Sequence, residues 1–255
     1  MAPLSADICS AQRAIWSSLI RSGLSRLSGE RQKKRNWRPI ILLFRSPDSP
    51  TTPALRGMAR SLVSENGIVT DFELVTSSDE PDIAPQDETR LGVFDRRVVC
   101  EDRYQTVENL CRYHGFAALR PNTVLLPWSA HRHAPERFCA LLDTASELDF
   151  NLLLFDPGPD TGVGKRIDVW WRVDGGNLGF SIALLRFITR EARWERAEVR
   201  LLLSSPDTSA NDHLRSSARH LLAEARLEAT IRVINDRLSD KSFEERVIEE
   251  ARSWR

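Results

Sequence analysis

The chain lacks the features that mark several protein classes. Its four cysteines, Cys9, Cys100, Cys111 and Cys139, are scattered over 255 residues and form no Cys-x-x-Cys pair. This pattern favours reduced thiols in a cytosolic protein over a disulfide framework. No stretch approaches the ~18 consecutive apolar residues that a membrane-spanning helix requires, and the N-terminus has no basic region followed by an apolar one. We therefore expect this chain alone to form no path across a membrane.

Motifs that support catalysis are also absent. There is no Gly-x-Ser-x-Gly nucleophile motif, and no spacing of Asp and Glu indicates an acid/base pair. The glycine-rich stretch 158–165 fails as a phosphate-binding P-loop: five residues separate Gly158 from Gly164 where a P-loop has four, and Arg166 follows Lys165 where Ser or Thr is required. The nucleotide signature of universal stress proteins is missing too. We expect no enzymatic activity and no cofactor.

Three polar segments have both a functional and a structural interpretation. His131, His133 and Cys139 offer three zinc ligands where a structural site needs four, so we interpret the His131 segment as a solvent-exposed loop and expect no metal. His114, on the apolar face of a predicted helix, is expected to be a hydrogen-bonded core histidine. Ser204-Ser205-Pro206 could contact a ligand at the end of a strand, but we interpret it as a turn.

Charge is unevenly distributed although 36 basic residues balance 36 acidic ones. Residues 1–38 contain eight Lys or Arg against two acidic residues, so the remainder carries a net charge of −6. Residues 8–27 have the apolar spacing of an amphipathic helix, and the basic run 31–35 follows them. Two interpretations remain open: a juxtamembrane helix that meets anionic lipid headgroups, or a helix docked on the body. The acidic body is not expected to bind nucleic acid.

From residue 36 onward, predicted strands alternate with predicted helices. This order is typical of an α/β fold with a largely parallel sheet and helices on both faces. We predict three parts: a basic connecting helix and linker over 1–35, a first α/β lobe over 36–150 and a second over 151–255. The predicted strands are 40–44, 68–75, 91–99, 124–126, 150–155, 166–173, 199–203 and 229–234, and the predicted helices are 53–65, 101–119, 134–148, 178–189, 209–226 and 242–252.

Several segments in this order resemble the cytoplasmic C-terminal domain of cation-chloride cotransporters, in a form closer to bacterial than to animal members. They begin with Asn36-Trp37-Arg38-Pro39 and the Arg-Pro-Asn-Thr strand start at 120–123. Farther along, Asp168-Val169-Trp170-Trp171 precedes a turn at Asp174-Gly175. The adjacent tryptophans are expected to be core or interface anchors. The residues that carry the resemblance are Asn36, Trp37, Arg38, Pro39, Pro121, Asn122, Thr123, Asp168, Trp170, Trp171, Asp174 and Gly175.

The resemblance implies a function and a set of partners. The chain would fold into two lobes like universal stress proteins. It would act as a regulatory and dimerisation domain without transport or catalytic activity. The partners would be a second copy of the chain, the transmembrane domain of the same transporter and, through residues 8–35, anionic lipid. As part of the transporter it would lie at the cytoplasmic face of the plasma (inner) membrane, and as this fragment it would be soluble. The alternative is a nucleotide-sensing module like a universal stress protein.

Overall fold

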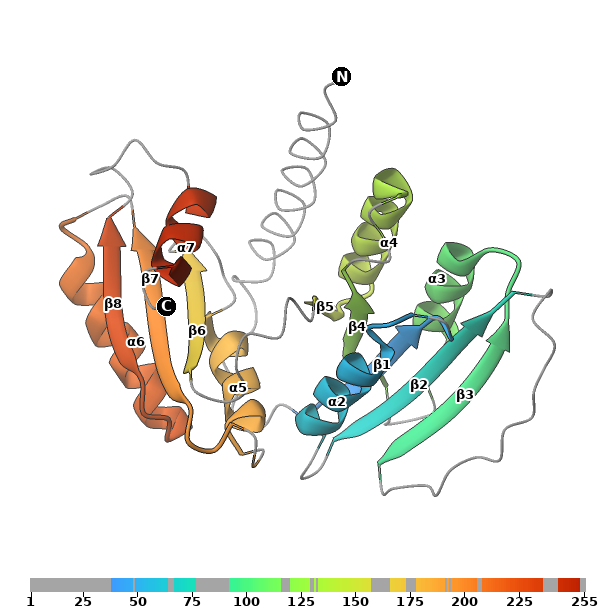
Figure 1. Cartoon of the computed structure of the whole chain (residues 1–255), viewed down its shortest axis with the longest axis horizontal. Helices are drawn as coiled ribbons and strands as arrows, with labels where there is room; N and C mark the ends of the chain where they lie inside the picture. The colour runs from blue at the N-terminus through green and yellow to red at the C-terminus, as the bar shows by residue number, and fades with distance from the viewer. Residues whose placement is uncertain are drawn as a thin grey trace. The chain divides into compact units, whose positions relative to one another are not determined.

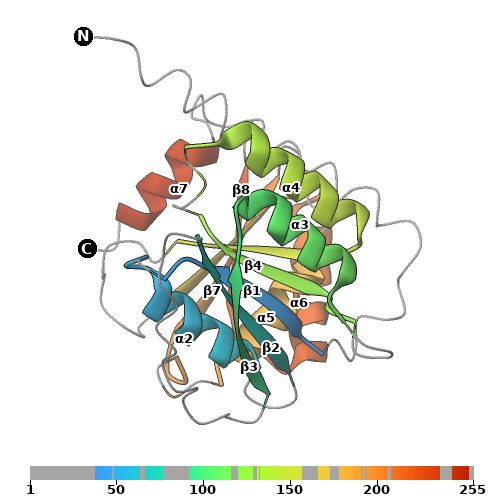
Figure 2. The same ribbon diagram turned by 90° about the vertical axis from the view of Figure 1, so that its right-hand side faces the viewer.

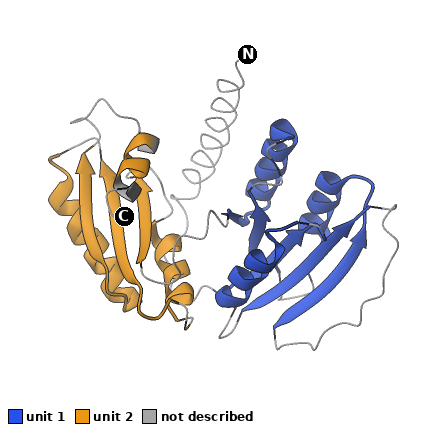
Figure 3. Cartoon of the chain, viewed as in Figure 1, with its two compact units in different colours: residues 1–25, 35–161 blue, residues 26–34, 162–255 orange. Residues whose placement is uncertain are grey.

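The chain forms two compact units (Figure 3). The computed structural model describes residues 38–47, 49–63, 67–76, 92–115, 120–128, 131, 133–156, 166–172, 178–190, 192, 194–205, 208–235 and 243–252. Described residues up to 156 belong to the first unit and those from 166 to the second. The predicted helix at 8–27, the basic run 31–35 and the residues Asn36, Trp37, Asp174 and Gly175 lie outside the described residues.

The first unit is built on a five-stranded, fully parallel sheet with the order β3-β2-β1-β4-β5 (Figure 1). Its order reverses between β1 and β4, as in doubly wound folds. The strands are β1 (Ile40–Arg45), β2 (Ile68–Val75), β3 (Val93–Val99), β4 (Thr123–Pro127) and β5 (Asn151–Phe155), and the helices are α2 (Thr52–Leu62), α3 (Arg103–Tyr113) and α4 (Pro135–Glu147).

Side chains alternate between the two faces of this sheet. One face is apolar, and the other, the mixed face, carries both apolar and charged residues. Leu42, Phe72 and Leu126 project into a core with Val107 of α3 and Phe138 of α4. Helix α2 covers the other face, so helices lie on both sides of the sheet (Figure 2). The central strand β1 is buried at Ile41 to Phe44, as expected for a strand between two helix layers.

The second unit has a three-stranded parallel sheet with the order β6-β7-β8. Its strands are β6 (Arg166–Arg172), β7 (Glu198–Ser205) and β8 (Thr230–Asn235), and its helices are α5 (Leu178–Ile188), α6 (Asn211–Ala225) and α7 (Phe243–Arg252). Apolar residues of α5 and α6 pack on one face of this sheet, while α7 lies on the side away from α6 (Figure 1). The predicted α/β class with parallel strands and helices on both faces is confirmed.

Two details differ from the sequence predictions. Strand β5, which we placed in the second lobe, pairs with β4 and completes the first sheet, so the boundary between the units falls after it and not at residue 150. Ser204 and Ser205 form no turn; they end β7, and each is 1% exposed. None of the helices in the described part of the chain has the length and apolarity needed to cross a bilayer.

Candidate functional site

Residues of the sequence resemblance meet at the amino ends of the first sheet's strands. The Asn122 side chain donates to the Arg38 carbonyl oxygen (2.7 Å) and accepts from the Ile40 amide (3.2 Å) and the Thr123 hydroxyl (2.8 Å). Its backbone carbonyl accepts from the Asn151 amide at 2.8 Å. Asn122 therefore joins the starts of β1, β4 and β5, which is a structural role at the edge opposite the one where open α/β sheets bind ligands.

Pro39 takes part in the same arrangement through its backbone. Its carbonyl oxygen accepts from the Ile68 amide at the start of β2, at 2.9 Å. Thr123 is fully buried, so its hydroxyl needs the hydrogen bond that Asn122 provides. Pro121 immediately precedes this site and has no amide N–H to satisfy. These residues are explained by strand alignment, without any ligand.

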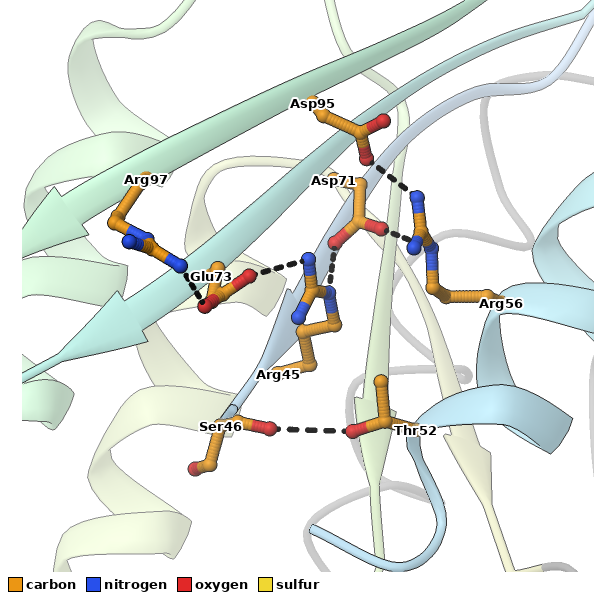
Figure 4. A network of polar contacts seen from close by, with 8 residues as sticks. All are labelled: Arg45, Ser46, Thr52, Arg56, Asp71, Glu73, Asp95 and Arg97. Atoms are coloured by element: carbon orange, nitrogen blue, oxygen red, sulfur yellow. Dashed lines mark hydrogen bonds and ion pairs between the residues drawn. The ribbon is translucent and has the colours of Figure 1, made fainter. Parts of the chain in front are cut away.

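A network of ion pairs covers the mixed face of the first sheet beneath α2 (Figure 4). Asp71 of β2 is 1% exposed, and its two oxygens meet Arg45 of β1 at 2.7 Å and Arg56 of α2 at 2.9 Å. Arg56 continues to Asp95 of β3 at 2.8 Å. The buried carboxylate thus ties two strands to the helix that covers them.

The network extends along the same face through Glu73, which meets Arg45 at 2.7 Å and Arg97 at 3.0 Å. Burial acts to raise the pKa of Glu73, but Arg45 and Arg97 outweigh it and hold the pKa below its ordinary value. Burial raises the pKa of Asp71, and Arg45 and Arg56 oppose that rise. The acidic and basic groups neutralise one another, which is the arrangement of a structural network and not of an acid/base pair.

The second sheet has a smaller ion pair at the Asp168 site. Arg200 of β7 donates two hydrogen bonds to Asp168 of β6, from Nε at 2.8 Å and from Nη2 at 2.7 Å. This fork geometry is the strongest form of an Arg–carboxylate pair. Arg166 reaches the same carboxylate at 3.2 Å. Asp168, like Asn122, is explained by contacts within its own sheet.

Trp170 and Trp171 point to opposite faces of β6, as the sequence predicts, because side chains alternate along a strand. Trp171 packs against the core formed with α5 and α6. Trp170 is on the face that carries Asp168 and is half-buried, as Trp171 is. Trp171 is therefore a core residue of its unit.

His131 does not lie in an exposed loop, contrary to our prediction. Its ring stacks on Phe138 with centroids 4.3 Å apart, and Nδ1 lies 3.1 Å from the Tyr104 hydroxyl. Within the described part of the chain, no group of three or more His, Cys, Asp or Glu residues could hold a metal ion. His114, as predicted, is hydrogen-bonded: Nε2 lies 3.3 Å from the Thr70 hydroxyl.

The environment of His131 gives one prediction about pH. Burial lowers its pKa to about 4, and Nε2 is buried without a hydrogen-bond partner among the described residues. Below pH ~6.5 the unfolded chain takes up a proton that the folded chain refuses, so stability falls between pH 6.5 and 4 by about 1.4 kcal/mol for each unit of pKa difference. Urea unfolding of the parent chain should show this loss.

A pair of variants isolates the contribution of this histidine. His131→Phe keeps an aromatic ring against Phe138 and cannot titrate, so the slope between pH 6.5 and 4 should become smaller. His133→Gln, which replaces an exposed histidine two residues away, is the control for removing a histidine from this segment. An equal slope in the parent and in His131→Phe would contradict this explanation.

Comparison with known proteins gives two similarities. No protein-family model matches the chain. It is 25% identical over 162 residues to potassium/chloride cotransporter 3 of Caenorhabditis elegans; the match covers 57% of this chain and 14% of that protein. The chain therefore spans about one seventh of the length of this relative. In structure it is similar to the cytoplasmic domain of a prokaryotic cation chloride cotransporter, with a TM-score of 0.60 and 18% identity over 78% of this chain and 80% of that one.

These similarities confirm the resemblance drawn from the sequence segments. The chain is similar in sequence to a potassium/chloride cotransporter, and its two-sheet α/β fold is that of a cation chloride cotransporter's cytoplasmic domain. The structure brings Arg38, Pro39, Asn122 and Thr123 together in one sheet and places Asp168 and the two tryptophans in the other. Sequence analysis missed the Asp71 network, whose signal is the alternation of acidic and apolar residues along 68–75.

Proposed function

We propose that this chain is the cytoplasmic regulatory and dimerisation domain of a cation-chloride symporter, without transport or catalytic activity of its own. The observation that carries the proposal is the fold match to a prokaryotic cation chloride cotransporter's cytoplasmic domain over 78% of this chain. The sequence similarity to a potassium/chloride cotransporter supports it independently. Ions would be carried by a membrane domain, and this chain would bind a second copy and that membrane domain.

The charged groups of both units support a non-catalytic role. In the first sheet Asp71, Glu73 and Asp95 are each held by arginines, and in the second Asp168 is held by Arg200. Burial raises the pKa of the Cys111 thiol to about 12, so it remains protonated and is a poor nucleophile. We propose that these groups hold the fold together and do not act on a substrate.

One observation favours a second candidate function, nucleotide sensing. The strand order of the first sheet reverses between β1 and β4, and open α/β sheets bind ligands at the carboxyl ends of strands at such a point. Residues that follow β1 here include Ser46, whose hydroxyl accepts from Arg103 at 2.8 Å. The sequence offers no nucleotide motif at this position, so we rank this candidate second.

Sedimentation equilibrium of the purified chain, with and without ATP, tests both candidates. The leading proposal is supported if the chain dimerises reversibly without nucleotide. A chain that stays monomeric at the highest soluble concentration contradicts the dimerisation role. Dimerisation that occurs only with ATP would favour nucleotide sensing instead. A higher melting temperature in the presence of ATP would also favour it, because a ligand that binds the folded state stabilises it.

The regulatory role is tested by ion flux. The chain is added to proteoliposomes that contain the membrane half of a cation-chloride symporter from the same source, and rubidium and chloride uptake is measured. The rate should change when the chain is added. Equal uptake with and without the chain would contradict the regulatory role and leave dimerisation to be decided by sedimentation.

A further inference from the structure

Strand β3 lies at the edge of the first sheet (Figure 1) and exposes two of its apolar side chains. Among the strands that the structure describes, it pairs with β2 alone. Phe94 is 44% exposed and Val99 is 64% exposed. A seven-residue edge strand with exposed apolar side chains is a template for pairing with another strand.

The hydrogen bonds to β2 fix which backbone groups of β3 face outward. The Val69 amide donates to the Gly92 carbonyl at 2.7 Å, and the Cys100 amide donates to the Val75 carbonyl at 2.9 Å. Alternate residues of a strand direct their N–H and C=O groups to the same side. Since Gly92 and Cys100 bond to β2, the backbone groups of residues 93, 95, 97 and 99 point away from it.

The sequence of β3, Val-Phe-Asp-Arg-Arg-Val-Val, is complementary to itself when read in the opposite direction. In an antiparallel pair with a second copy and Arg96 on the two-fold axis, Asp95 lies opposite Arg97 of the second copy. Val93 then lies opposite Val99, and Phe94 opposite Val98. Opposite charges and apolar pairs that face each other across strands both stabilise a sheet.

Other registers are less favourable. A shift by two residues in either direction also places one residue opposite itself, Asp95 or Arg97, and loses both Asp95–Arg97 pairs. If the two-fold axis lay between two residues, each residue whose backbone groups point outward would face a residue whose backbone groups already bond to β2. The favoured register sets Arg96 opposite Arg96, but both side chains are exposed, so water and salt screen their repulsion.

The charges within each chain match this register. Arg97 meets Glu73 at 3.0 Å, and Asp95 meets Arg56 at 2.8 Å. Pairing would place Arg97 of one copy beside Asp95 of the other. Charges would then alternate in sign along a row formed by Glu73 and Arg97 of one copy and Asp95 and Arg56 of the other. The same contact would form twice by symmetry, as an isologous dimer interface requires.

We propose that β3 pairs antiparallel with β3 of a second copy and joins two five-stranded sheets into one. This inference rests on the dimerisation part of the proposed function and names the surface through which the two copies bind. Two paired strands of seven residues each bury less surface than a standard interface, which buries ~1,600 Å². We therefore expect a concentration-dependent dimer. If Arg96 and Arg97 act only to prevent edge pairing, the experiment below gives the opposite result.

The variant Arg96→Cys tests the register directly. On the two-fold axis the two Cα atoms of residue 96 would be ~4.5 Å apart, which a disulfide can bridge. Mild oxidation should convert most of the R96C chain to a covalent dimer at a concentration where sedimentation shows dimers. The matched control is R112C, an exposed position on α3, which should cross-link no more than the parent chain.

Two second-site variants separate specific pairing from random collision. Pro at position 99 removes an N–H that points away from β2, so R96C/V99P should keep its sheet and cross-link at least tenfold more slowly. R96C/V99K, which sets a charge opposite Val93, should also cross-link slowly. Circular dichroism confirms that both are folded. Cross-linking unaffected by either substitution would overturn the proposal.

The outcomes distinguish this inference from the proposed function. A chain that dimerises in sedimentation while R96C cross-links no faster than R112C overturns the β3 interface and leaves dimerisation standing. A chain that is monomeric in sedimentation and does not cross-link overturns both. Dimerisation together with rapid, Val99-dependent cross-linking of R96C supports both.

Discussion

The variant Asp71→Ala is expected to lose about 3–5 kcal/mol of unfolding free energy, the range for removing one partner of a buried ion pair. The Asp71 side chain is 1% exposed, and that of Arg45 is 10% exposed. Removing the carboxylate leaves Arg45 with Glu73 alone and detaches Arg56 of α2 from β2. Urea unfolding followed by far-ultraviolet circular dichroism measures the change.

A matched control is available at the outer end of the same network. Asp95 is 36% exposed and contacts Arg56, which retains Asp71 when Asp95 is removed. Asp95→Ala should therefore cost less than ~1 kcal/mol, as exposed ion pairs do. If Asp71→Ala costs no more than Asp95→Ala, Asp71 does not stabilise the first sheet in this way.

A double replacement tests whether the cost comes from an unpaired charge. Arg45→Met with Asp71→Leu removes both buried charges and puts apolar side chains in their place. Replacing a buried ion pair by apolar residues is often neutral, so this double variant should be clearly more stable than Asp71→Ala. A double variant as unstable as the single one would indicate that the cost comes from lost packing and not from the partner that Arg45 loses.

The order and type of the elements could be predicted from sequence because their signals are local. The apolar run at 40–44 and the spacing of Phe138, Leu141, Leu142 and Ala145 indicate a buried strand and an amphipathic helix, and both are present. The assignment of strands to sheets depends on contacts far apart in the chain. Strand β5 follows α4 closely and belongs beside β4, which no local pattern could show.

The polar sites were harder to predict because they depend on the register between strands. Asp71 and Asp95 are far apart in sequence but lie directly opposite each other in β2 and β3, and Arg56 joins them from α2. His131 was misjudged for a related reason. Its neighbours in sequence are polar, but its burial comes from Phe138 and Tyr104, which belong to two different helices.

In the second unit, Asp168→Ala is expected to cost about 3 kcal/mol, near the lower end of the range for a broken buried pair. Arg200 is 7% exposed at its side chain and Asp168 is 18% exposed. Without the carboxylate, Arg200 of β7 loses both hydrogen bonds of the fork that joins it to β6. The loss is thus a large part of what so small a unit can supply.

Tryptophan fluorescence is a suitable probe for this variant. Of the tryptophans in the described part of the chain, Trp128 lies in the first unit, whereas Trp170, Trp171 and Trp194 lie in the second. Arg166→Ala is the control, because Arg166 reaches Asp168 at a longer 3.2 Å and is 23% exposed. It should cost less than ~1 kcal/mol. An equal cost for the two variants would contradict the role given to the Arg200 fork.

The same variant also tests whether the β3 contact depends on the second unit. Asp168→Ala weakens the second unit, whereas β3 and the Asp71 network belong to the first. The R96C cross-link should therefore persist in an R96C/D168A chain at a urea concentration that already unfolds the second unit. Asp71→Ala acts on β2, the strand that supports β3, so R96C/D71A should lose the cross-link under the same conditions. Loss of the cross-link in both would show that the β3 contact depends on the second unit.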